Sequence, residues 1–273
     1  MVMGAGVPDM AEDTLHNRAT YERQDVVRAY RESERLQAPE QTILRLLGPR
    51  LGEMRMLDIG VGGGRTTQYF APLVRQYTGI DYSASMIETC AARFGVGANG
   101  MSFKVCDARS MESFPDQSFE LVLFSFNGLD YVGHSDRMKA LAEIRRVTRP
   151  DGCFCFSSHN LNSSDQVFGL RHQFSGNPLK ITRKLARWVF VRYLYNRSVN
   201  VRSLATQAHE LINDGTFGFR LQAYYVRPLE QLRQLAGWTS DVQVLGLSTG
   251  AVLGPMEIAT ARDSWLYYVC KVS

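Results

Sequence analysis

The 273-residue sequence has few cysteines, a small charge imbalance and no long apolar run. No stretch approaches the roughly 20 apolar residues of a membrane-spanning helix, and no apolar signal stretch stands near its start. The five cysteines show neither metal-ligand spacing nor a disulfide framework. We therefore expect reduced thiols, no metal site, no membrane span and a cytoplasmic location. A net charge of +4 does not by itself imply binding to nucleic acid.

A short apolar run that breaks into glycines, residues 56–64, is the most informative feature present. It predicts a buried strand followed by a tight loop, in which glycine lets the backbone approach a ligand. Counted from Gly60, the third place is Gly62 but the sixth is Arg65, so the dinucleotide fingerprint is absent. The loop ends Gly64-Arg65-Thr66, which also lacks the Gly-Lys-Ser/Thr of a phosphate-binding loop.

The spacing Asp58-x-Gly60-x-Gly62-x-Gly64 resembles motif I of the class I S-adenosylmethionine (SAM) methyltransferases. The resemblance implies that these four residues belong to a SAM site. It also implies that S-adenosyl-L-homocysteine is the product, with no metal cofactor. For an isolated glycine loop, a structural turn or another nucleotide site is the alternative.

A second acid supports this interpretation, because residues 77–81 read as a strand that ends in Asp81. In doubly wound folds an acid at this place accepts hydrogen bonds from ribose hydroxyls. The run Gly79-Ile80-Asp81-Tyr82-Ser83-x-x-Met86 resembles the family's next motif, which implies cofactor contacts by Asp81, Tyr82 and Met86. The alternative role for Asp81 is to cap the helix predicted over 84–94.

The next two strands end in further candidates. Residues 102–106 precede Asp107 and Ala108, where the family places an acid against the adenine amino group and backbone near adenine N1. A solvated turn is the alternative for Asp107. Residues 119–125 form a near-continuous apolar run, typical of a buried parallel strand, and Ser125 stands at its ligand-binding end.

A helix over 136–147, a turn at 149–152 and a strand over 153–157 complete the resemblance, which covers roughly residues 55–160. Later segments predict a helix over 228–236 and strands over 242–247 and 265–271. The expected fold is α/β, a Rossmann-like doubly wound and mostly parallel seven-stranded sheet with an N-terminal helical segment and a cap insertion. The expected parts are residues 1–48 (helical segment), 49–160 (SAM-binding core), 161–227 (insertion) and 228–273 (remainder of the core sheet).

The N-terminal segment should be helical over 12–48, in two pieces around Ser33 and Pro39. In methyltransferases of this type such a helix often lies across the cofactor mouth, so Tyr21 is a candidate lid residue. Contact with a second subunit, and hence a homo-oligomer, is expected as well. Plain packing on the sheet is the alternative.

The insertion is basic and aromatic, with no acid between Asp165 and Glu210. In this superfamily such insertions usually form the acceptor-binding cap, and a helix is predicted over 179–195. Basic residues among aromatics can indicate RNA, an anionic lipid surface or a phosphorylated acceptor. Charge runs are more often solvated faces, so we favour a small-molecule acceptor over nucleic acid.

His159 is the best candidate for a general base, because it follows the fifth strand on the ligand side of the sheet. A lone histidine is more often structural, which is the alternative. Asn127 is a candidate polar contact near the transferred methyl group. Candidate walls of the acceptor site are aromatic: Phe126, Tyr131, Phe168 and Phe174.

No Asp-Pro-Pro-Tyr or Asn-Pro-Pro-Tyr follows the fourth strand, so the usual amino-methylating signature is absent. The sequence is similar to bacterial natural-product methyltransferases. That resemblance implies carbon methylation of a prenyl-chain alkene on an indole alkaloid, followed by cation-driven ring closure. Methylation of oxygen or nitrogen, modification of RNA through the basic insertion, and a non-catalytic SAM-fold module are the alternatives.

Overall fold

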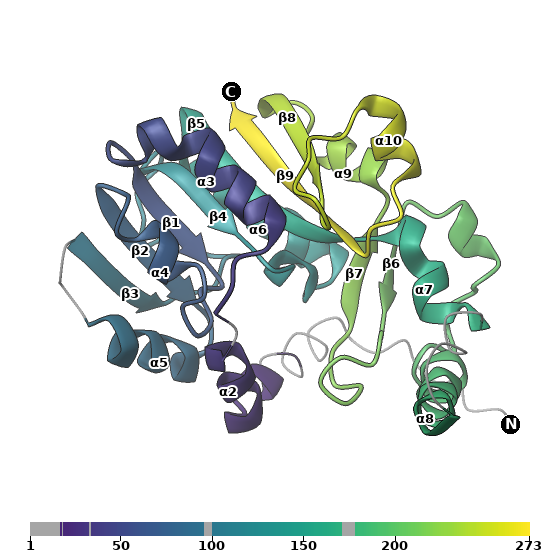
Figure 1. The fold of residues 1–273 in the computed structure, drawn as a ribbon. Coiled ribbons are helices and arrows are strands. Elements are labelled where there is room, and N and C mark those ends of the chain that lie inside the picture. The colour runs from purple at the N-terminus through teal and green to yellow at the C-terminus, as the bar shows by residue number, and fades with distance from the viewer. Residues whose placement is uncertain (1–16, 18, 33, 96–99, 171–177) are drawn as a thin grey trace, which may run out of the picture.

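The computed structural model describes residues 17, 19–32, 34–95, 100–170 and 178–273 (Figure 1). Its centre is a nine-stranded sheet in the order β3-β2-β1-β4-β5-β7-β6, with β9 paired to both β5 and β8. The strands are β1 Arg55–Ile59, β2 Gln76–Asp81, β3 Met101–Val105, β4 Phe119–Phe124, β5 Thr148–Asn160, β6 His209–Ile212, β7 Ala223–Val226, β8 Thr239–Gly246 and β9 Trp265–Val272.

The predicted Rossmann-like fold is confirmed, because β3, β2, β1, β4 and β5 run parallel to their neighbours. The last strand, β9, is antiparallel to β5 and to β8. All seven predicted strands are present, and two further strands come from the insertion. The hairpin β6–β7 joins the sheet where Tyr225 pairs with His159.

Helices cover both faces of the sheet, as the doubly wound pattern requires. The α-helices of the described residues are α2 Gln24–Glu32, α3 Ala38–Leu51, α4 Thr67–Phe70, α5 Ala84–Phe94, α6 His134–Val147, α7 Ser164–Phe168, α8 Pro178–Val189, α9 Pro228–Leu235 and α10 Pro255–Thr260. Short helical turns are η2 Gly128–Asp130, η3 Leu161–Ser163 and η6 Ser203–Ala205, and α8 continues as the π-helix η5 Phe190–Tyr195.

One apolar core lies on each face of the sheet, because side chains alternate between the two faces along a strand. Met56 packs with α3, α4 and α5 in one apolar cluster, whereas its neighbour Leu57 packs with α6, α9 and α10 in the other. Successive side chains of a strand point to opposite faces, so one strand supplies both cores. Each buried apolar side chain contributes roughly 1.5–3 kcal/mol to folding.

Strand β5, Thr148–Asn160, extends well beyond its predicted bounds of 153–157. Strand β5 already begins at Thr148, and the turn predicted at 149–152 is a bulge within it, where the pairing jumps from Phe119↔Thr148 to Leu121↔Cys153. Asp151 takes a positive φ of 62° at this bulge. Helix α4, which follows the glycine loop, spans only Thr67–Phe70, because Pro72 lacks the N–H that would continue it. Among the described residues, no helix is both long and apolar enough to cross a bilayer.

Candidate functional site

The glycine loop follows β1 at the carboxyl edge of the sheet. Gly60 and Gly62 have φ values of +64° and +53°, a region that side-chain-bearing residues rarely enter. A Cβ on Gly60 would lie 2.9 Å from the Phe124 ring. The backbone N–H of Gly62 donates to Asp81 Oδ2 at 3.0 Å, and that of Ser83 donates to Oδ1 at 2.9 Å. The loop and the acid of β2 are thus joined into one cradle.

This cradle opens into a small cavity, here called the cofactor cavity. Most of the predicted cofactor contacts line it. Its lining includes Gly60, Gly62, Asp81, Tyr82, Met86, Cys106, Ala108, Ser125, Phe126 and Tyr131, together with Tyr21 and Tyr30. Burial raises the pKa of Asp81 to about 6. A glycine cradle beside a buried acid fits the amino-acid and ribose parts of SAM.

Three predicted cofactor residues lie behind the cradle, outside the lining of the cavity. Asp58 accepts from Thr66 Oγ1 at 2.5 Å and from Tyr77 Oη at 2.6 Å, and burial raises its pKa to about 6. A Cβ on Gly64 would lie 2.3 Å from the Phe94 ring, so this glycine allows α5 to approach the loop.

Asp107 is the third of these residues. Its carboxylate pairs with Arg109, whose Nη2 lies 2.6 Å from Oδ2. Arg109 also pairs with Asp136. In this structure the Asp107 side chain therefore joins an ion-pair cluster, whereas its neighbour Ala108 lines the cofactor cavity.

Two tyrosines of the N-terminal segment enter the cofactor cavity. Tyr21 packs against Tyr82 and Tyr131 with ring centroids 5.8 Å apart, and Tyr30 lies 6.4 Å from Phe126. The cavity measures about 70 Å³, far below the 300–1,000 Å³ of a typical ligand pocket. Tyr21 and Tyr30 thus lie across this cavity, and the lid role of Tyr21 stays a prediction. Sequence reasoning missed Tyr30.

A buried ion pair ties the N-terminal helix α3 to the glycine loop. Arg65 Nη1 and Nη2 lie 2.5 Å and 2.6 Å from the Glu40 carboxylate oxygens. Ser125 and Tyr267 also donate to Glu40. Burial opposes ionisation of Glu40, but Arg65 outweighs it and holds the pKa of the carboxyl below its usual range. The pair was not predicted, because its partners stand 25 residues apart and carry no motif.

His159 lies at the end of β5 in a buried polar network. Asp130 Oδ2 accepts from the His159 backbone N–H at 2.6 Å and lies 2.8 Å from the ring Nδ1. Asp130 Oδ1 accepts from Arg137 at 2.5 Å and from Ser158 at 2.8 Å. Asp130 and Arg137 are fully buried. Asp130 was not predicted, although it follows β4 at the edge where ligands bind.

Asn127 is brought to the other side of the same ring. Its Nδ2 lies 3.3 Å from His159 Nε2, and its backbone N–H donates to Ser157 Oγ at 2.7 Å. Phe126 and Asn127 both have positive φ values, 55° and 60°. Non-glycine residues in this region are uncommon and concentrate at functional sites, with asparagine among the best tolerated.

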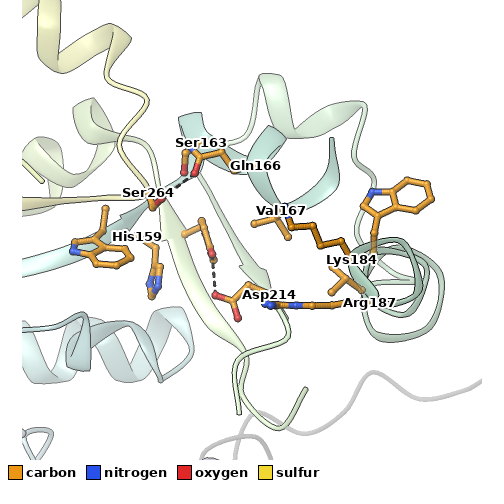
Figure 2. Close-up of a pocket in the computed structure, with 12 residues that line it drawn as sticks. His159, Ser163, Gln166, Val167, Lys184, Arg187, Asp214 and Ser264 are labelled. Atoms are coloured by element: carbon orange, nitrogen blue, oxygen red, sulfur yellow. Dashed lines mark hydrogen bonds between the residues drawn. The ribbon is translucent and has the colours of Figure 1, made fainter. Parts of the chain in front are cut away.

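A second cavity of about 360 Å³, here called the acceptor cavity, opens beside His159 between the core and the insertion (Figure 2). Its walls come from β5, η3, α7, α8, η5, β7, the start of β9 and the turn between β6 and β7. Its lining is His159, Ser163, Gln166, Val167, Lys184, Arg187, Trp188, Val191, Asp214, Tyr225, Ser264 and Trp265. Figure 2 shows Lys184 and Arg187 reaching in from α8, opposite His159.

Aromatic rings connect the two cavities through His159. Tyr131 of the cofactor cavity lies 6.1 Å from the His159 ring, and Trp265 of the acceptor cavity lies at the same distance on another side. Phe126 is 6.1 Å from Trp265, and Tyr225 is 4.8 Å from His159. The predicted residues His159, Phe126 and Tyr131 therefore meet at one junction.

The remaining predicted wall residues lie elsewhere. Phe168 lines a different cavity of about 590 Å³, and its carbonyl accepts from Trp188 Nε1 at 2.9 Å. Phe174 lies outside the described residues. Trp265 was missed, although an antiparallel last strand must begin at the edge where the parallel strands end. Trp188 and Tyr225 carried no comparable signal, because only the packing of the insertion brings them to His159.

Comparisons with known proteins locate the same core. Residues 56–152 match the family described as a methyltransferase domain. Over 109 residues the chain is 35% identical to the uncharacterized methyltransferase YcgJ of Bacillus subtilis, covering 39% of this chain and 41% of that protein. Over 113 residues it is 32% identical to the ubiquinone/menaquinone biosynthesis C-methyltransferase UbiE of Desulfotalea psychrophila, covering 40% and 43%. The match thus spans less than half of either relative.

A solved structure extends the likeness of fold to the whole chain. It is the 1,6-didemethyltoxoflavin-N1-methyltransferase of Burkholderia thailandensis, with bound 1,6-didemethyltoxoflavin and S-adenosylhomocysteine. The TM-score is 0.56 at 18% identity, covering 100% of this chain and 93% of that one. Residues 56–152 are thus similar to a methyltransferase domain, and the glycine cradle and Asp81 lie within this stretch.

Proposed function

We propose that this chain transfers the methyl group of SAM to a small, largely apolar molecule bound in the acceptor cavity. The observation that best supports this proposal is the position of the acceptor cavity. It opens on His159, and a row of aromatic rings leads from it to the cofactor cavity. When bound, SAM supplies an electrophilic methyl group on a sulfonium. Asp81 is suited to hold the ribose, and the backbone at Ala108 is suited to meet the adenine.

The chain's own part in the reaction is positioning and exclusion of water. The walls of the acceptor cavity hold an apolar acceptor between the insertion and the sheet. Tyr21 and Tyr30 close the cofactor cavity from the N-terminal side. His159, at the junction, takes the proton that the methylated acceptor releases.

Within this class, we propose that the methylated atom is carbon, in a prenyl-chain alkene of an indole alkaloid. Methylation of an alkene leaves a carbocation, which the faces of aromatic rings stabilise. Phe126, Tyr131 and Trp265 surround the junction where such a cation would form. The relative UbiE is itself named as a C-methyltransferase. The chain also resembles the C-methyltransferase of teleocidin biosynthesis, which would add cation-driven ring closure.

Methylation of nitrogen or oxygen in a small metabolite is the second candidate. The observation that favours it is the buried contact of His159 with Asp130, an arrangement suited to deprotonating an N–H or O–H group. The structural neighbour from Burkholderia thailandensis is named as an N-methyltransferase.

Incubation with methyl-labelled SAM and a panel of prenylated indoles, phenols and amines tests the proposal. We expect S-adenosylhomocysteine to form and the label to appear on carbon of a prenylated indole. Label found only on nitrogen or oxygen would select the second candidate. If the protein bound SAM but formed no homocysteine product with any acceptor, the enzymatic proposal would be wrong.

We propose no nucleic-acid substrate, although Arg183 and Arg197 are exposed on the insertion. Arg187 of the same helix is already bonded to the Asp214 carbonyl at 2.7 Å. An RNA substrate would require binding that weakens steeply with salt and falls on neutralising Arg183.

We also propose a homo-oligomer in the cytoplasm, formed through the N-terminal segment. Sedimentation at the monomer mass would contradict the oligomer.

A further inference from the structure

The Asp130 carboxylate accepts three hydrogen bonds and lies beside the His159 ring. The donors are Arg137 Nη1, Ser158 Oγ and the His159 backbone N–H, and Arg137 forms a fully buried ion pair with Asp130. The ionised carboxylate of such a pair offers only acceptor positions. His159 Nδ1 must therefore carry a hydrogen, since an acceptor there would face a second acceptor 2.8 Å away.

The opposite nitrogen of the ring, Nε2, is consequently an acceptor in the neutral imidazole. Asn127 Nδ2 lies 3.3 Å from His159 Nε2 and donates to it. This leaves Asn127 Oδ1 buried and without a hydrogen-bond partner among the residues that the structure describes. An unsatisfied buried acceptor costs about 1–3 kcal/mol, so its presence beside a candidate base calls for a function.

We propose that Asp130 is a positioning residue that holds His159 in the Nδ1–H form, and that the Asn127 amide rotates when His159 Nε2 takes a proton. This inference rests on the proposed function, in which His159 accepts the proton released by the acceptor. After rotation, Asn127 Oδ1 accepts the new Nε2–H. The orphaned oxygen is thus the partner held ready for the charged form of the base.

The surroundings allow this rotation at little cost. The two ends of an amide group have nearly the same size, so turning it over preserves the packing. The Asn127 backbone is held by the bond from its N–H to Ser157 Oγ. Asparagine is among the residues that best tolerate its φ of 60°, so this position combines a fixed backbone with a reversible side chain.

The proton balance is simple. The acceptor's C–H, N–H or O–H bond breaks, its electron pair stays with the acceptor, and the proton binds Nε2. The resulting imidazolium donates to Asp130 at Nδ1 and to Asn127 at Nε2, and it later returns the proton to water in the acceptor cavity. The titratable and charged groups that face His159 directly or across that cavity are Asp130, Arg137, Tyr131, Tyr225, Asp214, Lys184 and Arg187.

The first test is a measurement on the intact wild-type protein with ¹⁵N-labelled histidine. Two-bond ¹H–¹⁵N correlations distinguish the two neutral forms of the ring, and His159→Gln identifies which signal belongs to His159. We expect the Nδ1–H form. Finding the Nε2–H form would overturn the proposal. Because neither SAM nor acceptor is present, this result is independent of whether the proposed methyl transfer occurs.

Asp130→Asn tests the positioning role. An amide at this place can donate to Nδ1, so we expect His159 to change to the Nε2–H form. We expect kcat to fall about a hundredfold or more with little change in KM for SAM. Asp151→Asn is the matched control, because Asp151 is exposed at the β5 bulge and has a positive φ that suits asparagine. Unchanged tautomer and unchanged kcat in a folded Asp130→Asn protein would refute the positioning role.

Asn127→Asp tests the rotating amide. A carboxylate also tolerates the positive φ, but it can only accept, so it resembles the rotated state permanently. Because a carboxylate cannot donate to Nε2, we expect the same correlation spectra, recorded at one pH, to show a hydrogen on Nε2 of His159 that the wild type lacks. An unchanged spectrum would show that Asn127 is not a partner of Nε2. If Asp130→Asn does not fold, this variant and the wild-type spectrum still decide the matter.

Discussion

The cofactor cavity and the acceptor cavity lie on either side of the contact between Tyr131 and His159, yet they differ in construction. The cofactor cavity measures about 70 Å³, and its lining combines the glycine loop and strand ends of the core with the tyrosines Tyr21 and Tyr30. The acceptor cavity measures about 360 Å³ and is formed by side chains from the core and the insertion.

This difference reflects what each side has to recognise. A shared cofactor can be held by backbone geometry, since glycines and an acid at the end of a strand recur in any chain that folds this way. An acceptor differs from enzyme to enzyme, so its site depends on variable side chains supplied by an insertion. Changes to the two sides should therefore have separable effects on binding of SAM and of the acceptor.

The largest expected effect is on stability, and it concerns the buried Glu40–Arg65 ion pair that connects helix α3 to the glycine loop. Glu40→Gln leaves Arg65 buried without its counter-charge, and we expect a loss of about 3 kcal/mol or more in the free energy of unfolding. Chemical denaturation measures it. The matched control is Glu120→Gln, which breaks a partly exposed pair with Arg55 and should cost about 1 kcal/mol or less. Equal losses in the two variants would show that burial of the Glu40 pair is unimportant.

The second effect separates the two cavities directly. Asp81→Asn removes the charge from the acid that lines the cofactor cavity, so we expect the Kd for SAM to rise about tenfold to a hundredfold. Calorimetry measures this Kd, and acceptor binding should stay unchanged. Asp107→Asn provides the comparison, because its carboxylate pairs with Arg109 in this structure. An equal loss in Asp107→Asn would support the predicted contact of Asp107 with adenine.

A pH dependence of similar origin follows from the pKa of Asp81, which burial raises to about 6. Ionised Asp81 is the form that accepts from ribose, so SAM affinity should fall about tenfold between pH 7 and pH 5. Stability of the free protein responds in the opposite direction. A carboxyl whose folded pKa is raised stabilises below its unfolded value and loses that contribution as the pH rises through about 6. In Asp81→Asn, the fall in affinity over this range should be much smaller; an unchanged pH profile would rule out Asp81 as its source.

The smallest expected effect lies on the acceptor side. Trp265→Leu removes one aromatic wall at the junction, so we expect KM for a prenylated acceptor to rise about two- to tenfold. The Kd for SAM should not change. Tyr193→Leu is the control. Tyr193 is an exposed aromatic residue of the insertion outside the lining of the acceptor cavity, so this variant should behave as wild type. A loss of SAM affinity in Trp265→Leu would mean that the two cavities are not separable.

The predictable parts of the fold are those written in neighbouring residues. Four elements could be predicted because each is a continuous run of residues with a clear start and end. They are the strands over 56–59, 77–81 and 119–125 and the helix over 84–94. Asp81, Tyr82, Met86 and Ala108, which were predicted to contact the cofactor, line one cavity, because the carboxyl ends of parallel strands share one edge.

Other parts of the fold and of the site could not be predicted, because they depend on contacts between residues that are distant in the sequence. The hairpin β6–β7 joined the sheet through pairing with residues 159–160, a contact between segments about 65 residues apart. Asp130 stood in a recognised segment, but its role depends on partners at 137, 158 and 159. Asp107 and Asp58 look equivalent to Asp81 in the sequence, and only packing separates them.

The sequence by itself determined the class of cofactor site, because a glycine loop and strand-end acids act through local backbone geometry. Only the tertiary structure decided how the acceptor side is formed, since Trp188, Tyr225 and Trp265 come from three distant segments. It also decided the surroundings of His159, because Asp130 and Asn127 give the two nitrogens of this ring different partners. Local sequence patterns thus indicate the cofactor site that the fold provides, whereas long-range packing determines which side chains line the acceptor cavity.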